Sequence, residues 1–187
     1  AGGRRMKPGS LLAGRFEIVR HAASGGMGAV YEALDRVSGQ TVALKVLHTP
    51  VGERESRLVR EAEVLAELRH PAIVGHVAHG ATPQGVFYLA MEWIAGETLS
   101  QKLARGPLSV PEALTLGVEI ADALAAAHAR SIVHRDIKPS NVMIDARGAV
   151  RVLDFGIAHL RARGPRLTAT GALLGTPGYM APEQARG

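Results

Sequence analysis

Four short segments in a fixed order constrain this 187-residue chain more than any other feature of its sequence. They are a glycine-rich run at 24–28, Val-Ala-Leu-Lys at 42–45, His-Arg-Asp-Ile-Lys-Pro-Ser-Asn at 134–141, and Asp-Phe-Gly at 154–156. Each segment is a weak signal alone. Together they provide a loop that can cover a phosphate, a fixed cation, a carboxylate beside an amide, and a second carboxylate. The set therefore favours a chain that handles phosphoryl groups.

Composition and charge exclude several classes of function. The formal net charge is +5, from 22 Lys and Arg against 17 Asp and Glu, and the basic residues are scattered. Aromatic residues make up only 4%, so the mixed basic and aromatic surface of a nucleic-acid binder is not expected. The chain has no cysteine, which excludes disulfides, thiolate metal ligands and cysteine nucleophiles.

No segment of the sequence has the length and apolar character of a membrane span. The apolar run at 10–15 is too short for the core of a signal peptide. We therefore expect a cytoplasmic protein, with any membrane tether outside the visible chain.

The part of the chain before residue 96 is rich in predicted strands. Residues 1–14 are rich in Gly, Pro and basic side chains, and we expect them to form a flexible tail. Apolar patterns and turn residues predict strands at 16–19, 29–34, 41–47 and 86–91, a helix at 53–69 and a hinge at 92–96.

After residue 96 helices dominate. Ser109 and Glu112 form a capping-box signature, which predicts a helix reaching about Ala129 and mostly buried, since it is rich in Ala and Leu. Residues 142–145 and 150–153 flank an Arg-Gly turn and predict a hairpin. The sequence thus predicts an α+β chain with one domain at 15–95 and another at 96–187.

The glycine-rich run lies between two predicted strands. It therefore does not open a helix, as a dinucleotide-binding loop would, and no Gly-Lys-Ser/Thr follows it, as in a Walker-type loop. A glycine loop between strands can turn backbone N–H groups toward phosphate, because only glycine allows such close approach. The alternative is an ordinary hairpin turn.

Lys45 stands among apolar residues in a predicted strand and needs an anionic partner. Glu61 is a candidate partner, because it lies three residues after Leu58 and four before Leu65, on the apolar side of the predicted helix. Glu63 is a neighbouring candidate that points off that side. The alternative is an edge-strand lysine beside a solvated Glu61.

The segment 134–141 carries the most specific signal. Asp136 can accept or orient a hydroxyl proton, and Lys138 can balance charge on a transferring phosphoryl group. Asn141 offers an amide oxygen suited to Mg²⁺, and Asp154 offers a carboxylate at the end of a predicted strand. The alternative for the octet is a charged surface turn.

With these motifs the chain resembles a eukaryotic-like serine/threonine protein kinase of the bacterial branch, from roughly residue 14 to residue 187. Gly25, Gly28 and Val30 match the family's G-x-G-x-x-G-x-V loop, whereas Ala23 replaces its first glycine. The resemblance implies an α+β, two-lobed kinase fold, with a small β-rich N-lobe and a helical C-lobe that is incomplete here.

The resemblance also implies ATP and Mg²⁺ as cofactors and assigns residues to them. The catalytic and phosphate-clamping residues are Lys45, Glu61, Asp136 and Lys138, with Asn141 and Asp154 as metal ligands. The nucleotide-binding residues are Ala23, Ser24, Gly25, Gly26, Met27, Gly28, Val30, Ala43, Lys45, Met91, Glu92, Ile94 and Met143. Among them, Met91 takes the gatekeeper position.

Regulation is likewise implied by the resemblance. Arg135 stands where the family binds a phosphorylated loop residue, and Thr168 and Thr170 stand where bacterial relatives autophosphorylate. Thr176 matches a threonine that contacts the catalytic aspartate. The alternative is that these are ordinary polar loop threonines.

The expected activity is transfer of the ATP γ-phosphate to Ser/Thr hydroxyls of proteins, including the chain itself, with dimerisation for trans-autophosphorylation. The first rival is a non-catalytic pseudokinase or regulatory fragment, and the second is a small-molecule kinase. Ala-Pro-Glu at 181–183 and the Gly-Thr-Pro-x-Tyr segment argue against the second. Because the family's large lobe continues past this point, we expect residues 1–187 alone to be unstable and nearly inactive.

Overall fold

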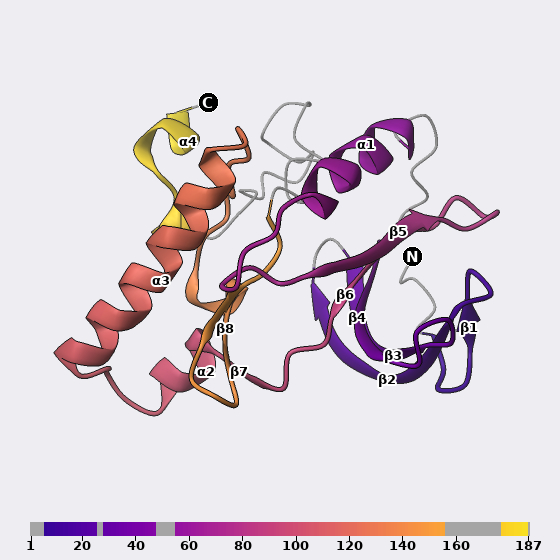
Figure 1. Cartoon of the computed structure of the whole chain (residues 1–187), viewed down its shortest axis with the longest axis horizontal. Coiled ribbons are helices and arrows are strands. Elements are labelled where there is room, and N and C mark those ends of the chain that lie inside the picture. The colour runs from indigo at the N-terminus through magenta and orange to yellow at the C-terminus, as the bar shows by residue number, and fades with distance from the viewer. Residues whose placement is uncertain (1–5, 26–27, 48–54, 156–176, 187) are drawn as a thin grey trace. The chain divides into compact units, whose positions relative to one another are not determined.

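The computed structural model describes residues 6–25, 28–47, 55–155 and 177–186 (Figure 1). It divides into two compact units. The first unit comprises Ala1–Arg69 and Gly75–Ile94, and the second comprises His70–Val74 and Ala95–Gly187. Residues 70–74, which lie between the first helix and the strand that follows it, thus belong to the second unit. The sequence did not lead us to expect this.

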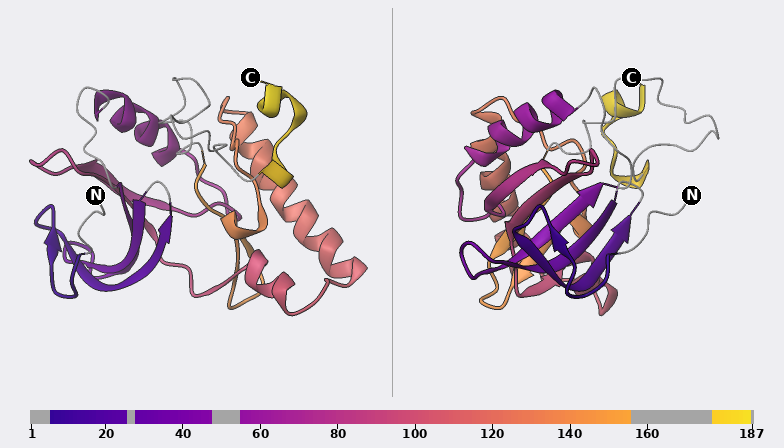
Figure 2. Two further views of the ribbon diagram at one scale, coloured as in Figure 1. Left: turned by 180° about the vertical axis from the view of Figure 1, so that it is seen from behind. Right: turned by 90° about the vertical axis from the view of Figure 1, so that its right-hand side faces the viewer.

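The first unit is a six-stranded antiparallel sheet with one helix beside it. The strand order is β1-β2-β3-β4-β6-β5, and the sheet curls strongly (Figure 2). The helix α1 lies along β5 (Figure 1). The elements are β1 (Leu11–Leu12), β2 (Phe16–Gly25), β3 (Gly28–Asp35), β4 (Thr41–Leu47), α1 (Glu55–Ala66), β5 (His76–Ala81) and β6 (Phe87–Glu92).

The four strands predicted for this region are confirmed as β2, β3, β4 and β6, and the predicted helix is confirmed as α1. The strand β5 was missed because its sequence, His-Val-Ala-His-Gly-Ala, has no clear alternation, and every position is half-buried. Its place in the sheet comes from pairing with β6 rather than from its own pattern.

Alternating burial fixes which face of the sheet carries the core. In β4, Val42, Leu44 and Val46 are buried, whereas Ala43 and Lys45 between them are half-buried. Large side chains from β2 join that core, and each contributes about 2 kcal/mol relative to an exposed position. The core cluster comprises Leu12, Phe16, Ile18, Ala29, Tyr31, Ala33, Val42, Leu44, Val46 and Ala90.

The part of the predicted flexible tail that the structure describes lies against the first sheet instead. Leu12 is buried, and the two residues of β1 pair with β2. The Gly9 N–H donates to the Ile18 carbonyl at 2.8 Å, and the Met6 N–H donates to the Tyr31 hydroxyl at 3.2 Å. Residues 6–12 lie against the sheet because the apolar side chains of Met6 and Leu12 pack on its core.

A buried ion pair closes the end of the first unit. Asp35 is fully buried and accepts two hydrogen bonds of 2.7 Å from the Arg15 guanidinium. The Ser38 hydroxyl and the Val37 N–H also donate to its carboxylate. These donors, Arg15 foremost, hold the pKa of Asp35 well below its usual range, against the effect of burial. The pair joins the turn before β2 to the last residue of β3.

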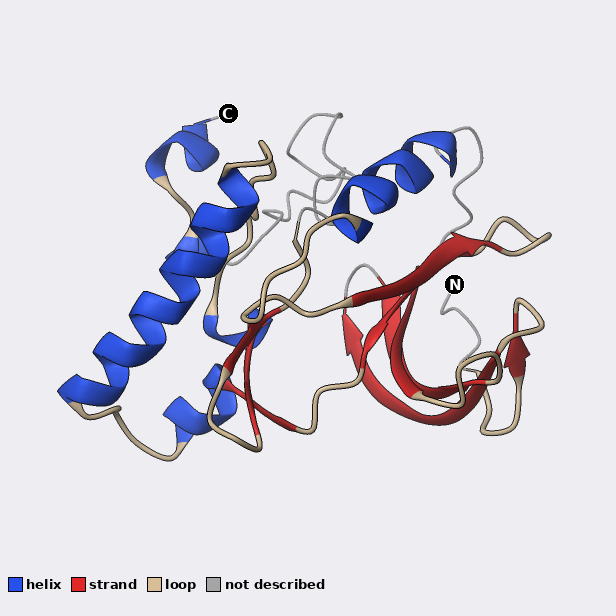
Figure 3. Ribbon diagram, in the orientation of Figure 1, coloured by secondary structure: helices blue, strands red, loops and turns tan. Residues whose placement is uncertain are grey.

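The second unit combines helices with a three-stranded sheet of order β7-β8-β9 (Figure 3). Segment 70–74 lies along β9 in parallel, with hydrogen bonds between Val74 and Val152 and between Val152 and Ala72. The elements are β7 (Gly96–Thr98), α2 (Leu99–Ala104), α3 (Val110–His128), η2 (Pro139–Asn141), β8 (Val142–Asp145), β9 (Val150–Val152), η4 (Pro177–Tyr179) and α4 (Pro182–Arg186).

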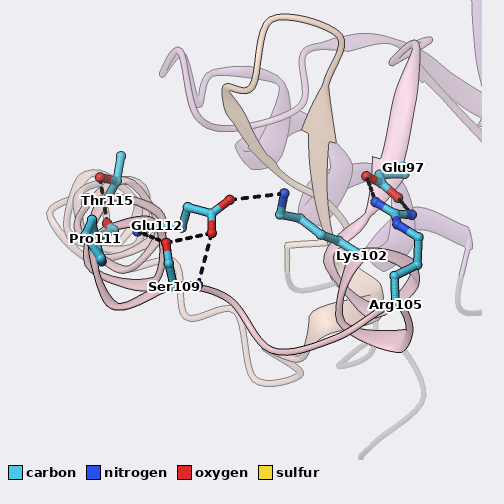
Figure 4. Close-up of polar contacts among 7 residues, drawn as sticks. All are labelled: Glu97, Lys102, Arg105, Ser109, Pro111, Glu112 and Thr115. Atoms are coloured by element: carbon cyan, nitrogen blue, oxygen red, sulfur yellow. Dashed lines mark hydrogen bonds and ion pairs between the residues drawn. The ribbon is translucent and has the colours of Figure 1, made fainter.

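The helix α3 begins at the predicted capping box. The Ser109 hydroxyl accepts from the Glu112 N–H, and the Glu112 carboxylate accepts from the Ser109 N–H and hydroxyl (Figure 4). Lys102 of α2 lies 3.5 Å from the same carboxylate, and Arg105 forms a bidentate pair with Glu97 (Figure 4). These contacts cap the start of α3 and link it to the last turn of α2.

The expectation that this helix is mostly buried is wrong. Only Leu116, Ala123 and Ala127 are buried, because a single narrow stripe of α3 packs inward. On another face Leu114 is 65% and Val118 is 68% exposed. The helix is nevertheless tied to the hairpin, since the Glu119 carboxylate accepts from the Val150 N–H at 2.9 Å.

Candidate active site

The glycine-rich run joins β2 to β3, and its outer glycines take different roles. Gly25 ends β2, and a Cβ there would meet no atom of the described residues beyond its chain neighbours within 4 Å, whereas a Cβ on Gly28 would lie 2.1 Å from the Val46 carbonyl oxygen. Gly28 is therefore required for β3 to approach β4. Gly26 and Met27 lie outside the described residues. On the β2 arm, Ala23 and Ser24 pair with Val30 and Ala29 of β3.

Register brings several predicted nucleotide-binding residues onto one face of the sheet. Val30 of β3 and Leu89 of β6 lie directly opposite Lys45 of β4. One step away, Ala43 lies opposite Met91. Directly opposed residues in a sheet share a face. The half-buried face of β4 thus carries Ala43 and Lys45 together.

Lys45 lies in the interior of the sheet, because β4 is hydrogen-bonded to β3 on one side and to β6 on the other. The edge-strand alternative therefore does not apply. On α1, Leu58 and Ala62 are buried, and Glu61 beside them is half-buried. Glu63 is exposed, so Glu61 lies nearer the packed side of the helix.

The predicted hinge leaves the sheet at the end of β6. The Glu92 N–H donates to the Gly75 carbonyl at 2.9 Å. Any contribution of the Glu92 backbone to an adenine ring would therefore have to come from its carbonyl oxygen. Ile94 is half-buried at the end of the first unit.

In the second unit, the His134 side chain holds segment 134–141 against the end of β9. Its side chain is buried, and its ring packs 4.7 Å from that of Phe155. Nε2 lies 2.7 Å from the Leu153 carbonyl oxygen, so it must donate, and Nδ1 accepts from the Asp136 N–H at 3.3 Å. This pattern requires the neutral ring. Burial lowers the pKa of His134, which favours that form.

The Asp136 carboxylate is oriented by two neighbours in the same loop. The Asn141 Nδ2 donates to Asp136 Oδ2 at 3.1 Å and to the Asp136 carbonyl oxygen at 2.8 Å. The Lys138 Nζ lies 2.8 Å from the same Oδ2. Asp136, Lys138 and Asn141 thus meet around one carboxylate oxygen, which a simple charged surface turn would not do.

Asn141 and Asp154 are suited to hold a magnesium ion. Because the Asn141 amide nitrogen is engaged by Asp136, its oxygen is the atom left for a cation, and Mg²⁺ prefers oxygen ligands. The Leu153 N–H donates to the Asn141 carbonyl at 2.9 Å, which brings the end of β9 beside the loop. Asp154 follows directly, so the donor set fits the ion.

Two residues of this region have left-handed backbone. The φ angle is 66° at Arg135 and 57° at Asp154. Such conformations are unfavourable for residues other than glycine and cluster at functional sites. The sequence pattern could not reveal these backbone conformations.

Met143, a predicted nucleotide-binding residue, lies on β8 opposite Thr98 and Arg151.

The segment after residue 176 contributes one contact that the sequence analysis missed. The Gln184 Nε2 donates to the Arg135 carbonyl at 2.8 Å, and Gln184 Oε1 accepts from the Ala181 N–H at 3.1 Å. No motif signalled Gln184, which only follows Ala-Pro-Glu. The predicted regulatory residues Thr168, Thr170 and Thr176 lie outside the described residues.

Comparison with known proteins shows that residues 16–187 match the protein kinase domain family, so the chain belongs to this family. The predicted two-lobed α+β kinase fold is thereby confirmed. Members of the family generally use ATP and Mg²⁺.

Three similar curated proteins come from bacteria. One is the Probable serine/threonine-protein kinase pknA2 of Bifidobacterium longum, 43% identical over 95% of this chain and 24% of its own length. Another is the DNA damage-responsive serine/threonine-protein kinase RqkA of Deinococcus radiodurans, 40% identical over 97% of this chain and 28% of its own. A third is the serine/threonine-protein kinase PrkC of Bacillus subtilis, 40% identical over the same shares.

The chain therefore spans about a quarter of the length of these relatives. Within the described residues, no helix combines the length and apolar character needed to cross a membrane.

Proposed function

We propose that the protein transfers the γ-phosphate of ATP to serine and threonine hydroxyls of proteins. The observation that carries this proposal is the Asp136 carboxylate, held between the Asn141 amide and the Lys138 ammonium within 3.1 Å. A carboxylate fixed in this way has a defined orientation and can accept a proton from a substrate that approaches from one direction. Family membership and the names of the similar proteins support the same reaction.

In the proposed mechanism, the hydroxyl of the substrate attacks the γ-phosphorus while Asp136 accepts the hydroxyl proton. The bond from the γ-phosphorus to the β–γ bridging oxygen breaks, and ADP leaves with that oxygen. Lys138 offsets the negative charge of the transferring group, and Lys45 binds the α- and β-phosphates with Glu61 as its partner. Asn141 and Asp154 would hold Mg²⁺, which neutralises phosphate charge when bound.

The nucleotide is proposed to bind along the glycine-rich run and the half-buried face of β4. Val30 and Ala43 would contact the adenine. Met91 would limit the depth of the pocket, and backbone atoms of Glu92 and Ile94 would bind the adenine edge. Alignment of Val30, Ala43 and Met91 by strand register supports this assignment for the first unit.

Regulation is proposed to act through the loop that follows Asp-Phe-Gly. Phosphorylation of Thr168 or Thr170 would place an anion near Arg135, and Thr176 would contact Asp136. Arg135 has an exposed side chain, which is consistent with binding a phosphate. The substrates would include the protein itself, in a transient dimer in the cytoplasm.

The test is intact-mass spectrometry of the full-length protein before and after incubation with ATP and Mg²⁺. Asp136→Asn should lower phosphate incorporation by about 10² to 10⁴-fold, since it removes the proton acceptor. Asp122→Asn is the matched control, because Asp122 is 73% exposed and pairs only at the surface with His70. It should incorporate phosphate at the parent rate, and the phosphates should map to Thr168 or Thr170.

Full phosphate incorporation by Asp136→Asn would contradict the proposed role of this carboxylate. A folded parent that binds ATP but gains no phosphate on itself or on added proteins would favour the pseudokinase alternative.

A further inference from the structure

Gln184 uses both ends of its side-chain amide to join two segments of the second unit. Its Oε1 accepts from the Ala181 N–H at 3.1 Å, and its Nε2 donates to the Arg135 carbonyl at 2.8 Å. Ala181 opens the Ala-Pro-Glu segment, whereas Arg135 directly precedes Asp136. One half-buried side chain therefore spans 49 residues of sequence to reach the loop that carries the proposed proton acceptor.

The backbone that Gln184 contacts is the least regular part of this loop. Arg135 has φ of 66°, a conformation that side-chain-bearing residues adopt only when their surroundings hold them there. On the next residue, the Asp136 N–H donates to His134 Nδ1 and the Asp136 carbonyl accepts from Asn141. The Arg135 carbonyl, which directly precedes these groups, accepts from Gln184. Two successive peptide groups of the loop, 135–136 and 136–137, are thus held by three side chains.

The chemistry of the contact requires an amide at position 184. The Arg135 carbonyl can only accept a hydrogen bond, so its partner must donate, while the Ala181 N–H needs an acceptor. The glutamine side chain supplies the donor and the acceptor together, at the end of one side chain. Glutamate has the same shape but would place a carboxylate oxygen against the carbonyl oxygen of Arg135. Gln184→Glu therefore removes one contact and retains the other.

We propose that Gln184 is a positioning residue, which couples the placement of the Ala-Pro-Glu segment to the orientation of Asp136 through the Arg135 carbonyl. In its effect on turnover, this inference rests on the proposed kinase activity. Gln184 touches no reacting atom. It acts by holding the strained peptide before Asp136, so that the carboxylate stays in line with the hydroxyl that it deprotonates.

The test makes the same change, glutamine to glutamate, at two positions of the full-length protein. Gln184→Glu should lower kcat about tenfold and leave KM for ATP within about twofold, since one hydrogen bond is lost and a repulsion is gained. Gln101→Glu is the matched control: Gln101 Oε1 only accepts, from the Thr98 N–H and hydroxyl, so glutamate keeps both contacts. Gln184→Met, which removes both of these hydrogen bonds without adding charge, should also lower kcat.

Hydrogen exchange provides a readout that does not depend on activity. Gln184→Glu and Gln184→Met should speed exchange of amides in residues 134–141 and leave those of β8 unchanged, whereas Gln101→Glu should change neither. Parent-like kcat and parent-like exchange in both Gln184 variants would overturn the inference. An inactive parent whose loop exchange still responds to Gln184 would instead reject the proposed function and retain the structural coupling.

Discussion

The two units hold the side chains proposed for function by different means. In the first unit, Val30, Ala43, Lys45 and Met91 come from regular strands, and cross-strand register alone sets which of them are neighbours. In the second unit, Asp136 and Asp154 lie in short loops and Asn141 in the short helix η2, and Asp136 is held by individual hydrogen bonds.

The difference indicates how each unit should respond to a damaging substitution. A register depends on the whole sheet, so damage to the first unit should spread across β2, β3 and β4. The loop of the second unit depends on a few donors and acceptors, so damage there should remain local. Hydrogen exchange measured segment by segment in the full-length protein distinguishes the two patterns.

The largest effect is expected from breaking the buried ion pair of the first unit. Asp35→Asn removes the charge that Arg15 binds and should lower the free energy of unfolding of the sheet by about 3 kcal/mol. This value is at the low end for such pairs because the Arg15 side chain is 32% exposed. Faster exchange should appear together in β2, β3 and β4.

The matched control for Asp35→Asn is Glu97→Gln in the second unit. Glu97 and Arg105 also form a bidentate pair, but on the surface (Figure 4). Water screens exposed pairs, so this change should leave exchange near the parent level. Equal destabilisation by the two substitutions would contradict the role assigned to burial.

A smaller effect is expected at the start of β3. Gly28→Ala places a Cβ against the Val46 carbonyl, 2.1 Å away in the present geometry, and should destabilise the β3–β4 pairing by about 2 kcal/mol. The affinity for ATP, measured by calorimetry, should fall with it if the loop binds phosphate. Gly25→Ala is the control for the pairing, because no atom of the described residues beyond its chain neighbours lies within 4 Å of the added Cβ.

If Gly25→Ala and Gly28→Ala weakened the β3–β4 pairing equally, the close approach at Gly28 would not be the cause. If only ATP affinity changed, the glycine would matter for the ligand rather than for the sheet.

The smallest effect is the response of the second unit to acid. Burial lowers the pKa of His134, and the opposing influence of the Leu153 carbonyl, Asp154 and Asp136 does not offset it. Below about pH 6.5 the unfolded loop therefore binds a proton more readily than the folded loop does. Stability of residues 134–141 should fall by at most about 1.4 kcal/mol per pH unit.

The measurement is exchange of the loop amides between about pH 7 and pH 5, corrected for the intrinsic pH dependence of exchange. His76 on β5, whose pKa burial lowers to about 4, should weaken the first unit over the same range. His76→Asn should abolish the response of β5 and leave that of the loop. A loop whose stability does not change with pH would show that His134 can be protonated without cost.

Much of the first unit could be predicted from local patterns. Alternation in β4 and the glycine-rich run between two strands predicted the strands that carry Val30 and Lys45. The strand β5 could not be predicted, because its partner β6 decides its burial. The burial of α3 was predicted wrongly, since an Ala- and Leu-rich sequence states what a helix is able to bury but not what packs against it.

The sequence by itself determined the family, the order of the motifs and the types of side chain available for phosphoryl transfer, since these depend on residue identity and spacing. Only the tertiary structure decided that His134 is neutral, that Arg135 and Asp154 have left-handed backbone, and that Gln184 reaches the Arg135 carbonyl. The physical reason is that protonation, backbone strain and long-range hydrogen bonds depend on neighbours brought together by folding.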